Sequence, residues 1–295
     1  MDRKIGIILK GVGGFYYVET STGEILECKA KGTFRKNKVS PVAGDRVCVM
    51  IPDDGFSLVE KIYQRKNHLI RPPISNLDQL IIVTSIRDPL PNTLVIDKMI
   101  AAAVYKNIEP VVVISKSDLS SVDWLRDIYS KSGIKTIVFS MKDGCGADEV
   151  KNLLKNKVSA FTGNTGVGKS TLLNFINPNL MLETGDISRK LGRGRHTTRQ
   201  VELFKLGGGY IADTPGFSTV DIGRYEIIKK EDIQYCFKEF APYLNSCKFT
   251  SCSHICEKGC SIIEAVNNGK IDKSRYNSYV AMYNEVKDIK DWEIR

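Results

Sequence analysis

The sequence predicts a multidomain protein with a small β-barrel, then an α/β domain with a parallel sheet, then a helical segment that binds a metal. Three observations predict this order. Short β-favouring runs with glycine turns fill residues 1–67, strands and helices alternate from 79 to 212, and five of the eight cysteines lie between 236 and 260. At 295 residues, the chain is long enough for each domain to bury a core of its own.

The N-terminal β-runs predict a closed barrel with an OB-fold. They span residues 4–9, 15–20, 24–29, 46–50 and 57–63. OB-fold barrels bind nucleic acid through basic and aromatic side chains on one face. Such side chains are available at Phe34, Arg35, Lys36 and Lys38. A barrel that serves only docking or stability fits the same residues.

After a linker at Arg71-Pro72-Pro73, the pattern is typical of a parallel sheet covered by helices. Strands are expected over 79–84, 110–115, 135–139, 158–161, 201–205 and 210–212. Helices are expected near 93–105, 122–130 and 147–156, and from 170 onwards. The central part of the chain is therefore predicted to be an α/β domain.

A glycine-rich stretch between an expected strand and an expected helix fits G-x-x-x-x-G-K-[ST]. It reads Gly163-Asn164-Thr165-Gly166-Val167-Gly168-Lys169-Ser170, and we include the next residue, Thr171, in the nucleotide-binding set. Glycines let such a loop wrap a phosphate with its N–H groups inward. Lys169 supplies charge to the β- and γ-phosphates and Ser170 supplies a hydroxyl to Mg²⁺. A glycine-rich turn that binds nothing is the alternative, but the complete motif predicts a bound nucleoside triphosphate.

Two motifs before this loop indicate a guanine nucleotide. Ser115-Lys116-Ser117-Asp118 follows an apolar strand, as the guanine-reading N-K-x-D of GTPases does. There the Asp carboxylate accepts the N1–H and the exocyclic amine of guanine, which adenine cannot offer. Ser140 follows the next strand, where GTPases place a loop whose backbone meets the guanine oxygen. A K-x-D alone is better explained by a solvated turn, so this inference depends on the phosphate loop.

Two further motifs follow the phosphate loop. They are Gly192-Arg193-Gly194-Arg195-His196-Thr197-Thr198-Arg199 and Asp213-Thr214-Pro215-Gly216-Phe217. Asp213 ends a strand, so its carboxylate can hold a Mg²⁺-bound water, and the N–H of Gly216 can meet the γ-phosphate. Thr198 can complete the coordination shell of Mg²⁺ when the γ-phosphate is present, and Thr197 is the second candidate for this role. These are the parts that phosphoryl transfer to water requires.

The order of these motifs is a circular permutation of the GTPase domain, because the guanine-reading motifs come first. With an N-terminal barrel and a C-terminal cysteine cluster, the chain resembles the ribosome small-subunit-dependent GTPase A family over its whole length. The resemblance implies an OB-fold RNA-binding domain over 1–67, a permuted GTPase domain over 68–222 and a zinc-binding domain over 223–295. It further implies a GTP hydrolase that binds the small ribosomal subunit and its rRNA and assists late subunit maturation. Ser115 departs from the family pattern, which has Asn or Thr there, so weaker nucleotide affinity is expected, with specificity resting on Asp118.

Phe217 stands where many GTPases have the glutamine that orients the attacking water. An apolar ring cannot do this, so slow hydrolysis by the isolated protein is expected. His196 is the candidate for the missing function, and the family resemblance implies that role during ribosome-stimulated turnover. A histidine that only contacts phosphate or RNA is the alternative.

The cysteine cluster reads Cys247-x₄-Cys252-x-His254-x₅-Cys260, with Cys256 inside it. Three thiolates and one imidazole are enough to close a tetrahedral zinc site that has no open position for chemistry. By spacing, Cys252, Cys256 and Cys260 could instead share one helix face, and unliganded thiols are a further alternative. The resemblance favours the set without Cys256. A clustered set with a histidine predicts metal rather than disulfides, and hence a reducing cytoplasm.

The charge balance of 43 basic against 34 acidic residues, +9 in all, suits a polyanionic partner. No apolar run is long enough to cross a membrane. We therefore expect a cytoplasmic monomer with GTP or GDP, Mg²⁺ and one structural Zn²⁺, and neither membrane nor DNA among its partners. Two rival functions are an RNA-binding protein whose nucleotide site is only a conformational latch, which Phe217 would allow, and a P-loop ATPase or kinase, which Asp118 argues against.

Overall fold

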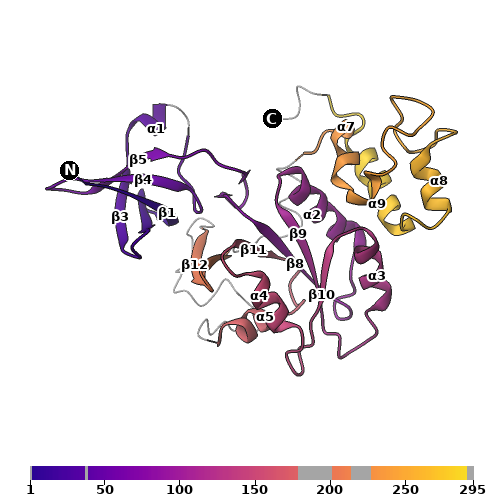
Figure 1. Ribbon diagram of the computed structural model, residues 1–295, viewed down its shortest axis with the longest axis horizontal. Helices are drawn as coiled ribbons and strands as arrows, with labels where there is room; N and C mark the ends of the chain where they lie inside the picture. Colours follow the sequence, from indigo (N-terminus) through magenta and orange to yellow (C-terminus); the bar gives the residue numbers. More distant parts are fainter. Residues whose placement is uncertain (1, 37–38, 179–200, 214–226, 291–295) are drawn as a thin grey trace. The chain divides into compact units, whose positions relative to one another are not determined.

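The computed structural model describes residues 2–36, 39–178, 201–213 and 227–290 (Figure 1). The contacts between residues group the chain into two compact units that are interleaved in the sequence. The first unit holds the N-terminal barrel together with most of β11 and with β12 and β13. The second holds most of β8, then β9, β10, α2, α3, α5 and the C-terminal helices. The expected domain boundaries after residues 67 and 222 stay predictions.

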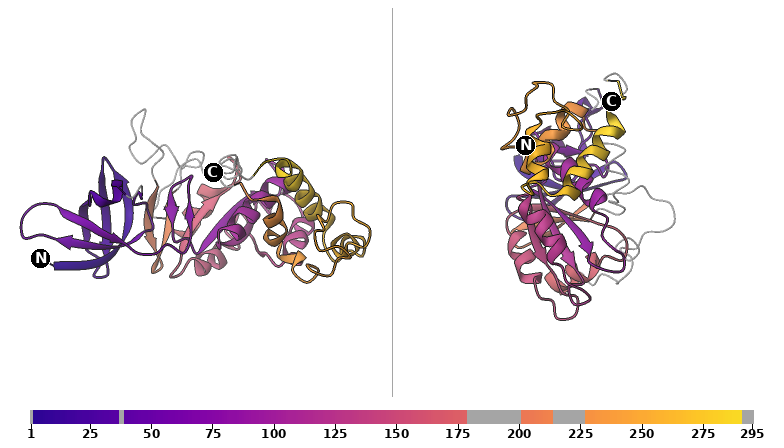
Figure 2. Two further views of the ribbon diagram at one scale, coloured as in Figure 1. Left: turned by 90° about the horizontal axis from the view of Figure 1, so that it is seen from above. Right: turned by 90° about the vertical axis from the view of Figure 1, so that its right-hand side faces the viewer.

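The N-terminal strands form the predicted closed barrel, drawn in indigo and purple in Figure 2. Its elements are β1 (Asp2–Val12), β2 (Phe15–Thr20), β3 (Ile25–Ala30), the short helix α1 (Thr33–Lys36), β4 (Arg46–Ile51) and β5 (Ser57–Ile62). The order around the barrel is β1-β2-β3-β5-β4, with β3 and β5 parallel and the other pairs antiparallel. Six buried side chains fill the barrel: Ile8, Val18, Cys28, Val47, Val49 and Val59. Phe34 is half-buried and packs against this core, and its expected part in nucleic-acid binding stays a prediction.

The central strands form one six-stranded sheet, and a two-stranded ribbon of β6 (His68–Leu69) and β7 (Ile74–Ser75) precedes it. The strands of the sheet are β8 (Gln79–Ser85), β9 (Glu109–Ser115), β10 (Lys135–Val138), β11 (Val158–Thr162), β12 (Glu202–Leu206) and β13 (Gly209–Asp213). Their order is β10-β9-β8-β11-β13-β12. Every residue of β8 is buried, which is typical of a strand covered on both faces.

The expectation of a parallel sheet was wrong at one edge, where β12 runs antiparallel to β13. The reason is the connection between them, Gly207-Gly208, in which both residues have positive φ angles of 58° and 80°. Two glycines with positive φ favour a two-residue hairpin turn, which joins antiparallel neighbours.

The helices of the central region lie where the sequence predicts them. They are α2 (Thr93–Tyr105), α3 (Asp123–Lys131), α4 (Ala147–Leu153) and α5 (Lys169–Ile176). The Asn92 side chain caps α2 by accepting the N–H of Val95 at 3.2 Å. Among the described residues, no helix is long and apolar enough to cross a membrane.

The C-terminal region is helical, as predicted, and consists of α7 (Lys230–Ile233), η2 (Gln234–Cys236), η3 (Lys238–Phe240), α8 (Ser261–Asn267) and α9 (Lys273–Val286). An aromatic core holds these short elements together, with the rings of Phe240 and Tyr279 5.0 Å apart. Tyr279 is 1% exposed, so the tyrosines at helical spacing in α9 serve packing, as their spacing predicts.

A buried ion network joins α9 to α2. Arg275 donates to Asp97 at 2.6 Å and to both carboxylate oxygens of Glu239 at 2.7 and 3.2 Å. The guanidinium also lies 4.5 Å from the centre of the Phe237 ring. Each of these charged side chains is fully or almost fully buried, so the charges depend on one another for compensation.

Candidate nucleotide site and metal centre

The glycine-rich stretch connects β11 to α5 and has a backbone that only glycine tolerates. Gly163, Gly166 and Gly168 have φ angles of 141°, 79° and 90°. A Cβ on Gly163 would lie 2.1 Å from the carbonyl oxygen of Val83, and one on Gly168 would lie 2.9 Å from the sulfur of Met141. The loop is therefore both strained for other residues and closely packed by its neighbours. Gly168 is the N-cap of α5, so the first N–H groups of that helix belong to the loop.

Lys169 lies across this loop. Its Nζ donates to the carbonyl oxygens of Gly163 and Asn164, at 2.5 and 2.8 Å. Burial lowers its pKa to about 8. A phosphate placed in the loop would oppose that shift, because a nearby negative charge favours the ammonium form. Ser170 is buried in the first turn of α5, and Thr171, next to it, is half-buried.

The structure brings the K-x-D motif and the loop that begins at Ser140 together. Asp118 Oδ1 accepts the backbone N–H of Met141 at 3.2 Å. The loop itself is a tight turn, since the N–H of Ser140 donates to the carbonyl of Cys145 and the carbonyl of Ser140 accepts from Gly144. Two segments that the sequence associates with guanine are thus hydrogen-bonded to one another.

Ser115 links these guanine-associated segments to the phosphate loop. Its side chain is fully buried, and its Oγ lies 2.5 Å from the carbonyl oxygen of Val167 and 3.2 Å from that of Thr84. Ser115 therefore contacts the phosphate loop through its hydroxyl, although it lacks the side-chain amide of an asparagine at this position. Lys116 has a positive φ of 58° and its Nζ donates to the carbonyl of Asp88.

Sequence reasoning missed the segment after β8, which lies beside the same loops. Pro89, Leu90 and Pro91 line a narrow cavity together with Gly163, Asn164 and Val167. Its place directly after the carboxyl end of β8 could have indicated it, because ligands of open α/β sheets bind outside the carboxyl ends of the strands. Leu90 is 77% exposed there.

The two motifs that follow the phosphate loop lie only partly within the described chain. Asp213 is the last residue of β13, as predicted. His196, Thr197, Thr198, Gly216 and Phe217 lie outside the described residues.

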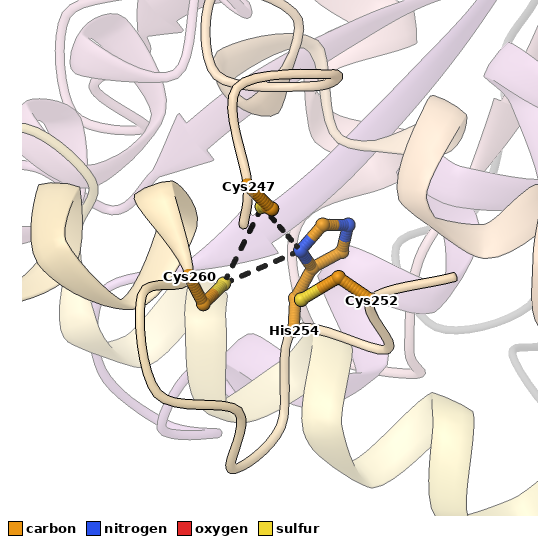
Figure 3. Close-up of side chains that lie close together, drawn as sticks. All are labelled: Cys247, Cys252, His254 and Cys260. Atoms are coloured by element: carbon orange, nitrogen blue, oxygen red, sulfur yellow. Dashed lines mark hydrogen bonds between the residues drawn. The ribbon is translucent and has the colours of Figure 1, made fainter. Parts of the chain in front are cut away.

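Four side chains of the C-terminal region converge, as Figure 3 shows. The ligand atoms of Cys247, Cys252, His254 and Cys260 all lie within 4.8 Å of one another. The Cys247 sulfur is 3.5 Å from His254 Nδ1 and 3.8 Å from the Cys260 sulfur, and His254 Nδ1 is 3.4 Å from the Cys260 sulfur. A tetrahedral zinc with bonds of about 2.0–2.3 Å needs ligand atoms about 3.3–3.8 Å apart. The three distances among Cys247, His254 and Cys260 lie in this range and Cys252 is the fourth donor nearby, so the chemistry of the set suits Zn²⁺. Cys256, in contrast, is exposed, and all eight cysteines are free thiols.

Neighbouring groups orient the cluster. His254 Nε2 lies 2.9 Å from Gln234 Oε1, which leaves Nδ1 facing the sulfurs. Burial lowers the pKa of His254, which favours the neutral imidazole that binds metal. The Glu257 carboxylate shapes the loop by accepting the N–H groups of Ser253, Ile255 and Cys256 at 2.6, 3.0 and 3.1 Å. No spacing signal in the sequence pointed to Gln234, which lies 20 residues before the histidine.

Comparisons with known proteins find family models for two regions of the chain. The family model of the RsgA GTPase matches residues 62–223, and that of the RsgA N-terminal domain matches residues 5–59. A "Small ribosomal subunit biogenesis GTPase RsgA" of Caldanaerobacter subterraneus is 45% identical over 98% of this chain and 97% of its own length. The protein of the same name from Ruminiclostridium cellulolyticum is 42% identical, with 98% and 96% covered.

Solved structures agree with these relatives. YjeQ from Thermotoga maritima superposes with a TM-score of 0.83 at 37% identity and covers 98% of this chain and 100% of its own. YloQ, described as a circularly permuted GTPase, gives a TM-score of 0.81 at 33% identity, with 98% and 96% covered. Fold and site together define a circularly permuted P-loop GTPase with an N-terminal barrel and a C-terminal cysteine–histidine cluster. The chain belongs to the RsgA GTPase family, which confirms the resemblance inferred from the motifs.

Proposed function

We propose that this protein hydrolyses GTP while bound to the small ribosomal subunit and assists that subunit late in its maturation. One observation carries the proposal: in a chain of this family, the guanine-associated motif is hydrogen-bonded to the phosphate loop. The contact is made by the hydroxyl of Ser115 and the carbonyl oxygen of Val167. The curated relatives that match over nearly the whole chain are named small ribosomal subunit biogenesis GTPases.

In this proposal, the loop from Gly163 to Ser170 cradles the phosphates with its N–H groups, and Lys169 neutralises charge on the β- and γ-phosphates. Ser170 and Thr198 would hold Mg²⁺, which supplies neutralising charge to the phosphates, and Asp213 would bind one of its waters. Gly216 donates its N–H to the γ-phosphate, and Thr171 belongs to the nucleotide-binding set. Replacing Lys169 would remove turnover without unfolding the protein, since its charge faces the loop rather than a core.

Base recognition is assigned to the segments that meet at Met141. Asp118 accepts two donors of guanine, Lys116 flanks the base, and the backbone at Ser140 meets the guanine oxygen. Ser115 holds the first of these segments against the phosphate loop by its hydroxyl contact with Val167.

His196 is proposed to position the attacking water, because Phe217 has no hydrogen-bonding atom. The basic residues around it are attracted to rRNA phosphates, which would order this segment on the subunit. The isolated protein would then turn over slowly and the bound protein faster.

The barrel and the metal centre are proposed to hold the protein on rRNA. On the barrel, Lys29 Nζ lies 4.0 Å from the centre of the Phe56 ring and 5.2 Å from that of Phe15. Phe56 is exposed, and an exposed aromatic ring with a lysine beside it suits single-stranded nucleic acid. Cys247, Cys252, His254 and Cys260 would hold one structural Zn²⁺. We propose domains over 1–67, 68–222 and 223–295 in a cytoplasmic monomer that has no membrane or DNA partner.

Turnover of GTP measured with small subunits, with large subunits and with neither tests the proposal. Faster turnover with small subunits alone is the expected result. Tight binding to small subunits without any gain in rate would favour the rival function, an RNA-binding protein whose nucleotide site is only a latch. Equal use of ATP and GTP would contradict the assigned base recognition.

A further inference from the structure

The hairpin of β12 and β13 is attached to the barrel by three polar contacts. Lys10 in β1 lies 2.7 Å from Glu202, the first residue of β12. Glu19 in β2 accepts from Lys205 at 2.5 Å and from the hydroxyl of Tyr210 at 2.6 Å. The barrel and the hairpin belong to one compact unit, and β1 and β12 are in contact.

Glu19 contacts both strands of the hairpin at once. Lys205 and Tyr210 are cross-strand partners in the β12–β13 ladder, and each binds a different oxygen of the same carboxylate. Only 8% of Glu19 is exposed. Burial alone would raise the pKa of Glu19, but the hydrogen bonds from Lys205 and Tyr210 hold it below its usual value, so the carboxylate stays charged. A buried charge of this kind depends on its partners, unlike most surface ion pairs.

In the sequence, the hairpin lies between the two motifs that follow the phosphate loop, residues 192–199 and 213–217, which we call the switch motifs. Glu202 follows the basic stretch with His196 and Thr198 by a few residues, and β13 ends at Asp213, which opens the D-T-P-G motif. Because the two strands are hydrogen-bonded throughout, a displacement of one is passed to the other.

We infer that Glu19, assisted by Lys10, is a positioning residue that couples the barrel to both switch motifs. A small displacement of the barrel when it binds RNA moves the hairpin with it. The ends of the two switch motifs that are joined to the hairpin then move as well. This inference rests on the proposed function. It assigns the barrel two roles: binding rRNA, and transmitting the effect by which the small subunit stimulates GTP turnover.

A charge-reversal experiment on the Lys10–Glu202 pair tests the coupling. GTP turnover is measured with saturating small subunits and without them for Lys10→Glu, for Glu202→Lys and for the double variant. Each single variant is expected to lose stimulation about 3- to 30-fold, the range typical of a broken coupling contact, with unchanged basal rate and KM for GTP. The double variant restores the pair with reversed polarity and regains most of the stimulation.

Two controls separate coupling from simple loss of charge. Lys10→Glu combined with Glu24→Lys restores the net charge without restoring the contact, and stimulation stays low. Lys4→Glu breaks a 2.7 Å ion pair with Glu24 within the barrel and leaves stimulation as in the wild type.

Glu19→Gln tests the central residue directly. It keeps the size and hydrogen-bonding capacity of the side chain but removes its charge, and it lowers stimulation as Lys10→Glu does. Circular dichroism checks that this variant folds.

Two results would overturn the inference. One is stimulation of the Lys10→Glu and Glu19→Gln variants equal to that of the wild type. The other is a double variant no better than its single parents. If the wild type itself is not stimulated by small subunits, the proposed function fails instead, so the two failures are distinguishable.

Discussion

Replacing Arg275 with methionine is expected to loosen the attachment of α9 to α2 severely. The guanidinium is fully buried and is the cation that compensates both Asp97 and Glu239 in this network. Methionine fills similar volume, so the loss comes mainly from two uncompensated buried carboxylates. Breaking such a network by removing one partner costs about 3–5 kcal/mol. Native-state hydrogen exchange should therefore show amides of α9 opening about 10²–10⁴ times more readily.

An exposed ion pair between the same two helices supplies the matched control. Lys98 lies 2.6 and 2.7 Å from the carboxylate oxygens of Glu285, with both side chains partly solvated. Lys98→Met should cost at most about 1 kcal/mol, as is usual for solvent-exposed pairs. Equal exchange rates in the Lys98→Met and Arg275→Met proteins would refute the argument that burial sets the cost.

Four further outcomes are expected. Asp118→Asn should weaken GTP and GDP binding and favour xanthine nucleotides, because the amide presents a donor where guanine also has one; competition binding measures this, and unchanged guanine preference would contradict the assignment. Cys260→Ser should lose the zinc, which elemental analysis of the purified protein checks, while Cys256→Ser keeps it; the reverse outcome would replace the ligand set. His196→Ala should keep the basal rate and lose about 10²–10⁴-fold of the stimulated rate, measured at saturating small subunits; full stimulation would exclude the residue. Burial opposes ionisation of Glu257, but hydrogen bonds from the side chain and backbone of Ser253 and other backbone groups lower its pKa to about 2. Its stabilising effect is therefore complete above its usual pKa near 4.5 and is lost as the pH falls towards 2, and Glu257→Gln should flatten that part of the acid-unfolding curve.

The barrel could be predicted because its strands alternate and its turns contain glycine, signals that are local in the sequence. The strand boundaries were less accurate, since β1 extends over Asp2–Val12 where 4–9 was expected. Hydrogen bonding to β4 at one end and to β2 at the other prolongs it, and neither partner is visible in the segment itself.

The nucleotide and metal sites could be predicted as far as residue type and spacing specify the chemistry. What spacing does not specify is the partner of each group across the fold. The contact of Ser115 with Val167 joins residues 52 positions apart, and that of Gln234 with His254 joins residues 20 apart. Both depend on how separate elements pack, which no local pattern records.

The contact of Ser115 with the phosphate loop has a consequence for how the two ends of a nucleotide are recognised. Ser115 contacts Val167, and a Cβ on Gly168 would lie 2.9 Å from the sulfur of Met141 in the base-associated loop, so that one of the two would have to move. A substitution that reshapes one loop therefore shifts atoms of the other. The free-energy effects of a substitution in the base-associated loop and of one in the phosphate loop are therefore expected not to be additive. A change in base preference would require an adjustment of the phosphate loop as well.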